Sequence, residues 1–278
     1  MMGKSLRIVG MAGMAVTILA FGTLGGRAES AVAKDPWPEL ARAVFKDRAL
    51  LDGNGVIALD LPYRAEDAAV VPLTVRTAMS PGDARHVRAL TIVIDENPSP
   101  VAAVFTFGQK ADVNSISTRV RVDSYTNVHA VAELSDGKLY MVKTYVKAAG
   151  GCSAPAIKDA SAAKVHVGEM RLRQFASSDR PPASAPRQAQ IMIRHPNNSG
   201  LQMDQVTHLY IPPFFVDELK VWQGDELVLA MNGGISISEN PSIRFSYLPN
   251  GAATFRAEAV DTDKHVYKGE WPAQGSAM

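Results

Sequence analysis

The chain has 278 residues, enough for one large or two modest domains, because single hydrophobic cores rarely grow beyond that size. Hydrophobic residues make up 46% and charged residues 21%, which are ordinary globular values and exclude general intrinsic disorder. The formal net charge of +1 excludes a strong electrostatic attraction to nucleic acid or to an anionic membrane.

Residues 1–33 have the pattern of a secretory signal peptide. A short basic start precedes an apolar run over residues 8–24, and small residues then offer cleavage sites after Ala28 or Ala33. An uncleaved membrane anchor is the alternative, although the apolar run is just short of a comfortable bilayer span. No later segment is long and apolar enough to cross a bilayer. We therefore expect an exported protein with no stable membrane insertion once the signal is removed.

A short amphipathic helix is predicted next, ending near Leu50. Leu40, Val44 and Phe45 recur at helical spacing. Asp35 could cap the start of this helix, and the turn residues 52–55 end it.

From Val56 onward the apolar residues recur with a period of two, which is typical of β-strands. Turn residues such as Ser135-Asp136-Gly137 separate the runs. Short strands at this spacing predict a β-sandwich, and the lack of helices of crossover length argues against an α/β fold. The candidate strands are 56–61, 70–78, 87–94, 101–107, 115–122, 127–133 and 138–147.

Residues 153–163, rich in Ala and Ser, predict a linker, and a second β-series comes after it. In this series Asn250-Gly251 is the strongest hairpin signal of the chain, and residues 176–187 predict a loop. The candidate strands are 164–175, 188–195, 214–222, 226–231, 242–247, 252–259 and 265–271. The predicted fold is all-β: two immunoglobulin-like β-sandwich domains in tandem, over residues 34–152 and 164–272, after a short N-terminal helix.

Cys152 is the single cysteine of the chain, so it cannot form an internal disulfide. It could be an inert buried residue, a bridge to a second chain in a disulfide-linked dimer, or a reactive thiol. Its neighbours in Gly150-Gly151-Cys152-Ser153-Ala154-Pro155 are small and lie past the end of a predicted strand. The pattern therefore predicts an exposed functional thiol, with Gly150 and Gly151 as its flexible approach.

Positively charged residues near Cys152 in the sequence also favour a reactive thiol. Lys143, Lys147 and Lys158 are close in sequence and could favour the thiolate form. A thiol hydrolase would also need a histidine to accept the thiol proton, and nothing in the sequence places His129, His166 or His195 beside the cysteine.

Cofactor and metal chemistry find little support in the sequence. There is no glycine-rich phosphate loop and no haem-attachment motif. Six histidines and eleven methionines are scattered along the chain, so a copper-handling domain stays open as an alternative without being favoured. We predict no catalytic residue, no metal site and no cofactor.

Sequence pieces in both halves resemble one pair of protein families. In the first half, Gly150-Gly151-Cys152-Ser153-Ala154 is similar to the Gly-Gly-Cys-Gly-Gly arm of SoxY, the sulfur-carrier subunit of bacterial thiosulfate oxidation. In the second half, Arg194-His195-Pro196, Ile211-Pro212-Pro213-Phe214-Phe215 and Ser236-Ile237-Ser238-Glu239-Asn240-Pro241 resemble its partner subunit SoxZ. The single-chain arrangement resembles the SoxYZ-like carrier associated with quinoprotein alcohol dehydrogenases.

The resemblance implies a periplasmic carrier that is not itself an enzyme. Cys152 would be the covalent attachment point for a sulfur intermediate, and the SoxZ-like half would pack against the SoxY-like half without donating catalytic groups. The implied partners are c-type cytochromes or a hydrolase of a Sox-like pathway, and a quinoprotein alcohol dehydrogenase.

Two departures from the family pattern reduce the expected mobility of the segment that carries Cys152. Ser153 and Ala154 replace glycines and Pro155 comes next, which stiffens the segment, and the thiol is tethered at both ends instead of lying on a free tail. A docking or adaptor module in which the cysteine is incidental is the second hypothesis.

Overall fold

The structure is a computed structural model that describes residues 35–80, 82–155, 166–175 and 185–273. The expected signal peptide, most of the expected linker and most of the loop 176–187 lie outside the described residues. Residues Pro36–Met278 form one compact unit. Within the described ranges, no helix is long and apolar enough to cross a membrane.

Helix α1 spans Trp37–Phe45 and is shorter than the sequence predicted. Pro36 occupies the N-cap position without a side-chain capping hydrogen bond, so the expected cap by Asp35 is wrong. After the helix, Lys46 takes a positive φ of 57°, which breaks the helical path. The chain then forms strand β1 (Leu50–Asp52), which pairs in parallel with β8 (Leu139–Val146) and was not predicted.

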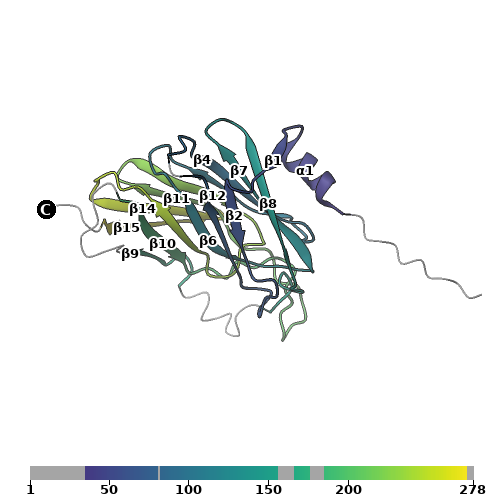
Figure 1. Ribbon diagram of the computed structural model, residues 1–278. Helices are drawn as coiled ribbons and strands as arrows, with labels where there is room; N and C mark the ends of the chain where they lie inside the picture. Colours follow the sequence, from purple (N-terminus) through teal and green to yellow (C-terminus); the bar gives the residue numbers. More distant parts are fainter. Residues whose placement is uncertain (1–34, 81, 156–165, 176–184, 274–278) are drawn as a thin grey trace, which may run out of the picture. The chain divides into compact units, whose positions relative to one another are not determined.

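The first half forms a seven-stranded β-sandwich, as predicted (Figure 1). Strands β8, β7, β4 and β5 make one sheet, and β2, β3 and β6 make the other. The burial of alternate residues in β6, from Ser115 to Val120, shows one face on the core and one on the surface. The strands not yet given are β2 (Ile57–Asp60), β3 (Val71–Thr77), β4 (Val87–Ile94), β5 (Val101–Phe107), β6 (Ser115–Val120) and β7 (Thr126–Leu134).

The second half repeats this topology strand for strand. Each strand corresponds to the one seven places earlier: the order β15-β14-β11-β12 matches β8-β7-β4-β5, and β9-β10-β13 matches β2-β3-β6. The chain is therefore a structural duplication of one sandwich. The strands are β9 (Met170–Phe175), β10 (Arg187–Ile193), β11 (Val216–Gln223), β12 (Glu226–Gly233), β13 (Ser242–Tyr247), β14 (Thr254–Asp261) and β15 (Val266–Pro272).

The two sandwiches are joined edge to edge through both of their sheets. Strand β5 pairs antiparallel with β12 from Phe107↔Leu229 to Ala103↔Gly233, and β6 pairs with β13 at Ser117↔Arg244. The described strands therefore form one nine-stranded and one six-stranded sheet that both run across the junction. Each joined edge would otherwise expose unpaired backbone groups, so the halves protect one another's edges.

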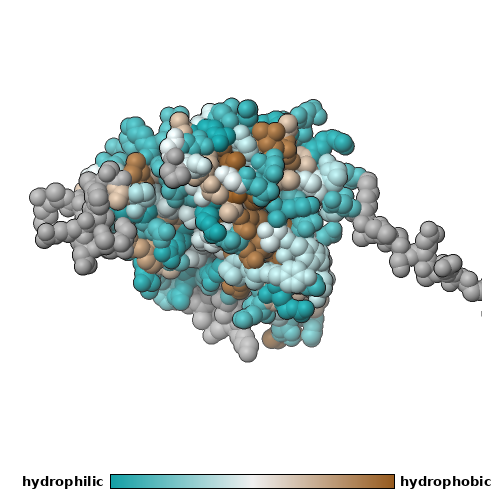
Figure 2. All heavy atoms as spheres, viewed as in Figure 1, coloured by the Kyte–Doolittle hydropathy of each residue, from teal (hydrophilic) through white to brown (hydrophobic). Residues whose placement is uncertain are grey.

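The hydrophobic core is also continuous across the junction. Phe105 and Leu73 of the first half belong to the same buried cluster as Met231 and Phe245 of the second. The face seen in Figure 2 is mostly hydrophilic, with apolar residues confined to smaller patches. A second, smaller cluster forms where α1 places Phe45 against Val93, Val131 and Leu139 on the other face of the nine-stranded sheet.

One turn prediction was wrong. The pair Asn250-Gly251 joins β13 to β14, which belong to different sheets, so it is a crossing between sheets and not a hairpin. The Asn250 side chain donates to the Gln223 carbonyl at 2.9 Å and accepts from the Ala252 N–H at 3.0 Å. Gly251 supplies the positive φ of 83° that the turn needs. The turn chemistry was therefore right, but the strand partner was set by the sandwich topology.

Candidate functional site

Cys152 is fully buried, with 0% of its surface exposed, so the expectation of an exposed thiol is wrong for this structure. The turn that carries it folds back onto the end of the first sandwich. Gly150 N–H donates to the Asp123 carbonyl at 2.8 Å, and Gly151 N–H donates to the Val122 carbonyl at 3.0 Å. The Cys152 N–H completes the turn by donating to the Asp123 Oδ1 atom at 3.1 Å.

The two glycines of this turn have different structural roles. Gly150 adopts a positive φ of 77°, which a residue with a side chain rarely takes. Gly151 has no room for a side chain, because an added Cβ atom would lie 2.1 Å from the Ala68 carbonyl oxygen. In this conformation both glycines hold a close-packed turn, and their expected role as a flexible approach stays a prediction.

The second half of the chain covers the turn from the other side. Ser199 Oγ donates to the Cys152 carbonyl oxygen at 2.5 Å, and Ser199 is itself buried. The Ser199 N–H donates to the Gln202 Oε1 atom at 3.0 Å, and Gln202 is fully buried. The cysteine therefore lies at a junction between the halves and not on a free interdomain loop.

Arg121 connects the turn to both halves of the chain. Only 1% of this residue is exposed, and its guanidinium donates to the Gly151 carbonyl at 3.2 Å and to the Asn197 carbonyl at 3.3 Å. Its backbone carbonyl accepts from the Asn97 side chain at 2.8 Å. Burial lowers the pKa of Arg121, while the charges of Glu239, Cys152 and Asp67 oppose that effect. A buried cation thus stands beside the cysteine turn.

The environment of Cys152 favours the neutral thiol. Burial, with a smaller contribution from the charge of Asp123, raises the pKa of the Cys152 thiol from 9.0 to about 12, and Arg121 offsets only part of this. The lysines expected to favour the thiolate are not among these causes. Lys147 instead stacks over the Tyr63 ring at 4.9 Å, and Lys158 lies outside the described residues. In this state the sulfur is buried and favours the neutral form.

The histidines considered as partners of the thiol have other neighbours. His129 contacts Asp95 at 2.9 Å and stacks on Trp37, with ring centroids 3.5 Å apart. His166 lies 3.7 Å from Glu169. None of the hydrogen bonds among the described residues joins a histidine to Cys152, so the geometry gives no support to a cysteine hydrolase.

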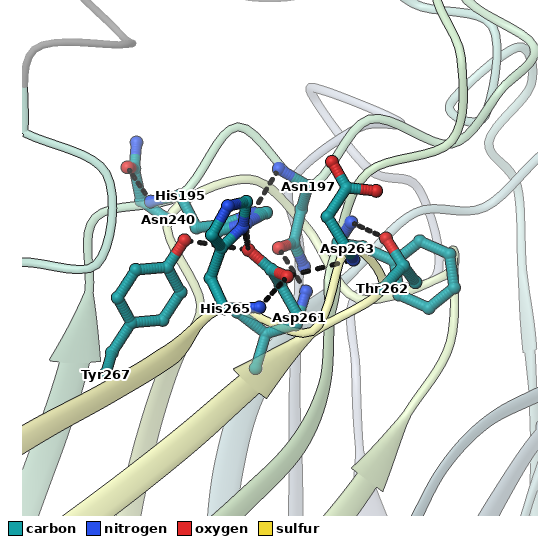
Figure 3. A network of polar contacts seen from close by, with 10 residues as sticks. His195, Asn197, Asn240, Asp261, Thr262, Asp263, His265 and Tyr267 are labelled. Atoms are coloured by element: carbon teal, nitrogen blue, oxygen red, sulfur yellow. Dashed lines mark hydrogen bonds and ion pairs between the residues drawn. The ribbon is translucent and has the colours of Figure 1, made fainter.

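His195 belongs to a polar network between the end of β14 and the start of β15, which Asn197 links to Arg121 (Figure 3). Asp261 lies at its centre: its carboxylate accepts from the Tyr267 hydroxyl at 2.7 Å and contacts His265 Nδ1 at 3.0 Å. The His195 Nδ1 atom accepts from the Asn197 N–H at 3.1 Å, and burial lowers the pKa of His195. In the part of the chain that the structure describes, no group of His, Cys, Asp and Glu could hold a metal ion.

Each half of the chain matches the model of a protein family. The model of "Sulfur oxidation protein SoxY" matches residues 41–152, and that of "Sulphur oxidation protein SoxZ" matches residues 177–272. The chain is a fused SoxYZ-like protein. The two matches succeed one another in a single chain, as the resemblance of the sequence pieces predicted. No curated protein matches the chain.

Solved structures add little to the family assignment. A superoxide reductase (neelaredoxin) from Ignicoccus hospitalis shares 11% identity over 33% of this chain and 79% of its own, with a TM-score of 0.29. A β-glycosidase from Bacteroides vulgatus shares 9% identity over 78% of this chain and 24% of its own, with a TM-score of 0.24. Neither likeness carries a functional argument.

Both halves of the fused SoxYZ-like chain contribute residues to the surroundings of the cysteine turn. The SoxZ-like half (residues 177–272) supplies Ser199 and Asn197, and its Ser236 carbonyl accepts from the Arg121 N–H at 2.7 Å. The SoxY-like half (residues 41–152) supplies Arg121 and ends at Cys152 itself. Sequence reasoning missed Arg121 and Asp123. Arg121 could have been singled out because it is a charged residue in the predicted strand 115–122, where polar and apolar residues alternate.

Proposed function

We propose that this chain is a periplasmic carrier that holds a sulfur intermediate covalently on Cys152 and presents it to partner redox enzymes. One observation carries the proposal: the SoxY match ends on Cys152, which is the only cysteine of the chain. The tandem SoxZ match supports a place in a sulfur-oxidation system. On this proposal the chain is not itself an enzyme.

Loading requires the cysteine turn to open. Five hydrogen bonds hold the turn closed. Two join the Gly150 and Gly151 N–H groups to the Asp123 and Val122 carbonyls. The other three join Asp123 to the Cys152 N–H, Arg121 to the Gly151 carbonyl and Ser199 to the Cys152 carbonyl. Each contributes about 0.5–1.5 kcal/mol, or more for a charged donor. The turn can therefore open without unfolding either sandwich, with Gly150 and Gly151 as the flexible approach in the open state.

The chemistry of attachment defines the class of partner. Joining the Cys152 sulfur to the sulfur of an anionic sulfur compound forms an S–S bond, releases the thiol proton and removes two electrons. The c-type cytochromes proposed as partners are the class that would accept those electrons, and a hydrolase of a Sox-like pathway would then act on the loaded group. The quinoprotein alcohol dehydrogenase is proposed as a further partner because of the single-chain arrangement.

The mass of freshly isolated protein tests the carrier function. We expect a fraction of the protein to carry an added mass that reductant removes and that maps to Cys152. The matched control is the Cys152→Ser variant, which should have only the unmodified mass. Protein that always has its unmodified mass, even when isolated from cells growing on reduced sulfur compounds, contradicts the carrier proposal.

The burial of Cys152 favours a second candidate function, a docking or adaptor module for a dehydrogenase or cytochrome. In that case the thiol is a structural residue. Replacing Cys152 with Ala separates the two functions, because an adaptor would keep its biological activity and a carrier would lose it. Comparing the thermal stability of the variant with that of the wild type controls for loss of the fold.

A further inference from the structure

A groove crosses the junction between the halves on the outer face of the six-stranded sheet. Its volume is about 420 Å³, and polar residues of β6, β10 and β13 dominate its lining. Ser117, Arg244 and Gln190 lie side by side across these three strands, because Arg244 pairs with both of the others in the sheet. Arg173 continues this row on β9 through its pairing with Gln190.

The groove and its margin are strongly basic. Arg119 and Arg244 line it, Arg173 and Arg171 stand at its β9 margin, and no Asp or Glu is among the described residues that line it. Of these four arginines, Arg171 contacts a carboxylate, that of Glu169 at 3.2 Å. We call the groove with these four residues the arginine groove.

Two of the arginines are held in place by neutral neighbours. Arg244 donates to Gln188 Oε1 and lies over the Phe175 ring at 4.1 Å, and Arg173 lies over the same ring at 4.8 Å. Neither contact neutralises the positive charge. A rigid guanidinium with unused donors is suited to bidentate recognition of carboxylates.

The distance over which the arginines are spread favours an extended ligand over a small one. From β6 to β9 there are three inter-strand spacings, or about 14 Å. A single small oxyanion cannot contact arginines over that span, whereas carboxylates along an extended acidic segment can.

The arginine groove is adjacent to the cysteine turn. Arg119 lies in β6, and Arg121 follows one residue after the end of that strand. Arg119 donates to the Asn240 carbonyl at 2.7 Å, and Arg121 donates to the Gly151 carbonyl. A protein docked in the groove would therefore lie next to the residues that hold the cysteine turn.

We propose that the arginine groove binds an acidic segment of the protein that acts on Cys152. The proposal rests on the carrier function and gives the chemistry of its partner: an extended run of Asp or Glu beside the active site of that partner.

A labelled hexaglutamate peptide is the probe, with the same peptide made of glutamine as its control. Fluorescence anisotropy measures binding to the full-length protein. We expect the double variant Arg173→Gln/Arg244→Gln to bind about tenfold more weakly, since two charged contacts are lost. The matched control is Arg76→Gln/Arg256→Gln, which removes two exposed arginines outside the groove and should change binding less than twofold.

Three outcomes would overturn the proposal. They are a wild type with no preference for the glutamate peptide, an equal loss of affinity in both double variants, and displacement of the peptide by sulfate far better than by chloride of equal ionic strength. The last result would indicate a site for a small oxyanion. The Cys152→Ala variant should bind the peptide like the wild type, so a failure of the carrier proposal appears in the adduct mass and not in this assay.

Discussion

Two properties of Cys152, its burial and its raised pKa, oppose the proposed carrier function. A thiol that accepts cargo must be accessible and at least partly ionised, whereas this one is buried and its pKa is raised to about 12. Both properties come from the close fit of the turn against Asp123 and Ser199. If the chain works in the periplasm as proposed, protection in the closed state would keep its lone thiol from forming unwanted disulfides.

The raised pKa predicts slow, strongly pH-dependent alkylation of the native protein. At pH 8 a thiol of pKa about 12 has roughly a thousandth of the thiolate of one at 9.0, so its reaction with iodoacetamide should be slower by a similar factor. The rate should rise about tenfold per pH unit while the fold persists. Mass spectrometry of native and guanidinium-unfolded protein measures the ratio, and equal rates at pH 8 would contradict the closed state.

The Ser199 hydroxyl is the contact by which the SoxZ-like half holds the Cys152 carbonyl. The Ser199→Ala variant loses the hydrogen bond to the Cys152 carbonyl, worth about 0.5–1.5 kcal/mol, so alkylation of Cys152 should be about two- to tenfold faster. Ser153→Ala is the matched control, because the Ser153 hydroxyl donates to Gly150 within the same turn. If both variants react at the wild-type rate, the SoxZ-like half does not restrain the cysteine.

At the scale of the elements, Gly150 and Gly151 should tolerate substitution differently. Gly151→Ala places a Cβ atom against two backbone carbonyls, of Ala68 and Val122, so it should destabilise the fold by at least about 3 kcal/mol or displace the turn. Gly150→Ala places its Cβ atom 3.9 Å from the Ser153 Oγ atom, an ordinary van der Waals contact, and should cost only about 1–2 kcal/mol for its positive φ. Urea unfolding measures both. Equal losses would show that the turn is loose in solution.

The elements were largely predictable from the sequence because their signals are local. The alternation of apolar residues predicted all seven strands of each sandwich, whereas β1 has only three residues and no pattern of its own. The burial of Cys152 was not predictable in this way, since it depends on Ser199, 47 residues further along the chain. The small residues that suggested mobility are the ones that permit close packing, and pattern alone does not separate these two roles.

At the scale of the whole molecule, the shared sheets make the two sandwiches one folding unit. Separating them would break the β5–β12 and β6–β13 pairings and expose core residues such as Phe105 and Met231. A junction of this kind also fixes the SoxZ-like half over the cysteine turn. In a fused chain the two halves meet at a high effective concentration, so the closed state does not depend on protein concentration.

Because the two sandwiches share both sheets, we predict a single cooperative unfolding transition. Phe105 in β5 and Phe255 in β14 are both fully buried, one in each half, and replacing either with Ala should cost about 3–5 kcal/mol. Because the core is continuous, each variant should lower the midpoint of the same transition, with equal calorimetric and van't Hoff enthalpies. Differential scanning calorimetry measures this. Two transitions, each shifted by only one of the variants, would show that the halves unfold independently and that the junction does not hold the SoxZ-like half against Cys152.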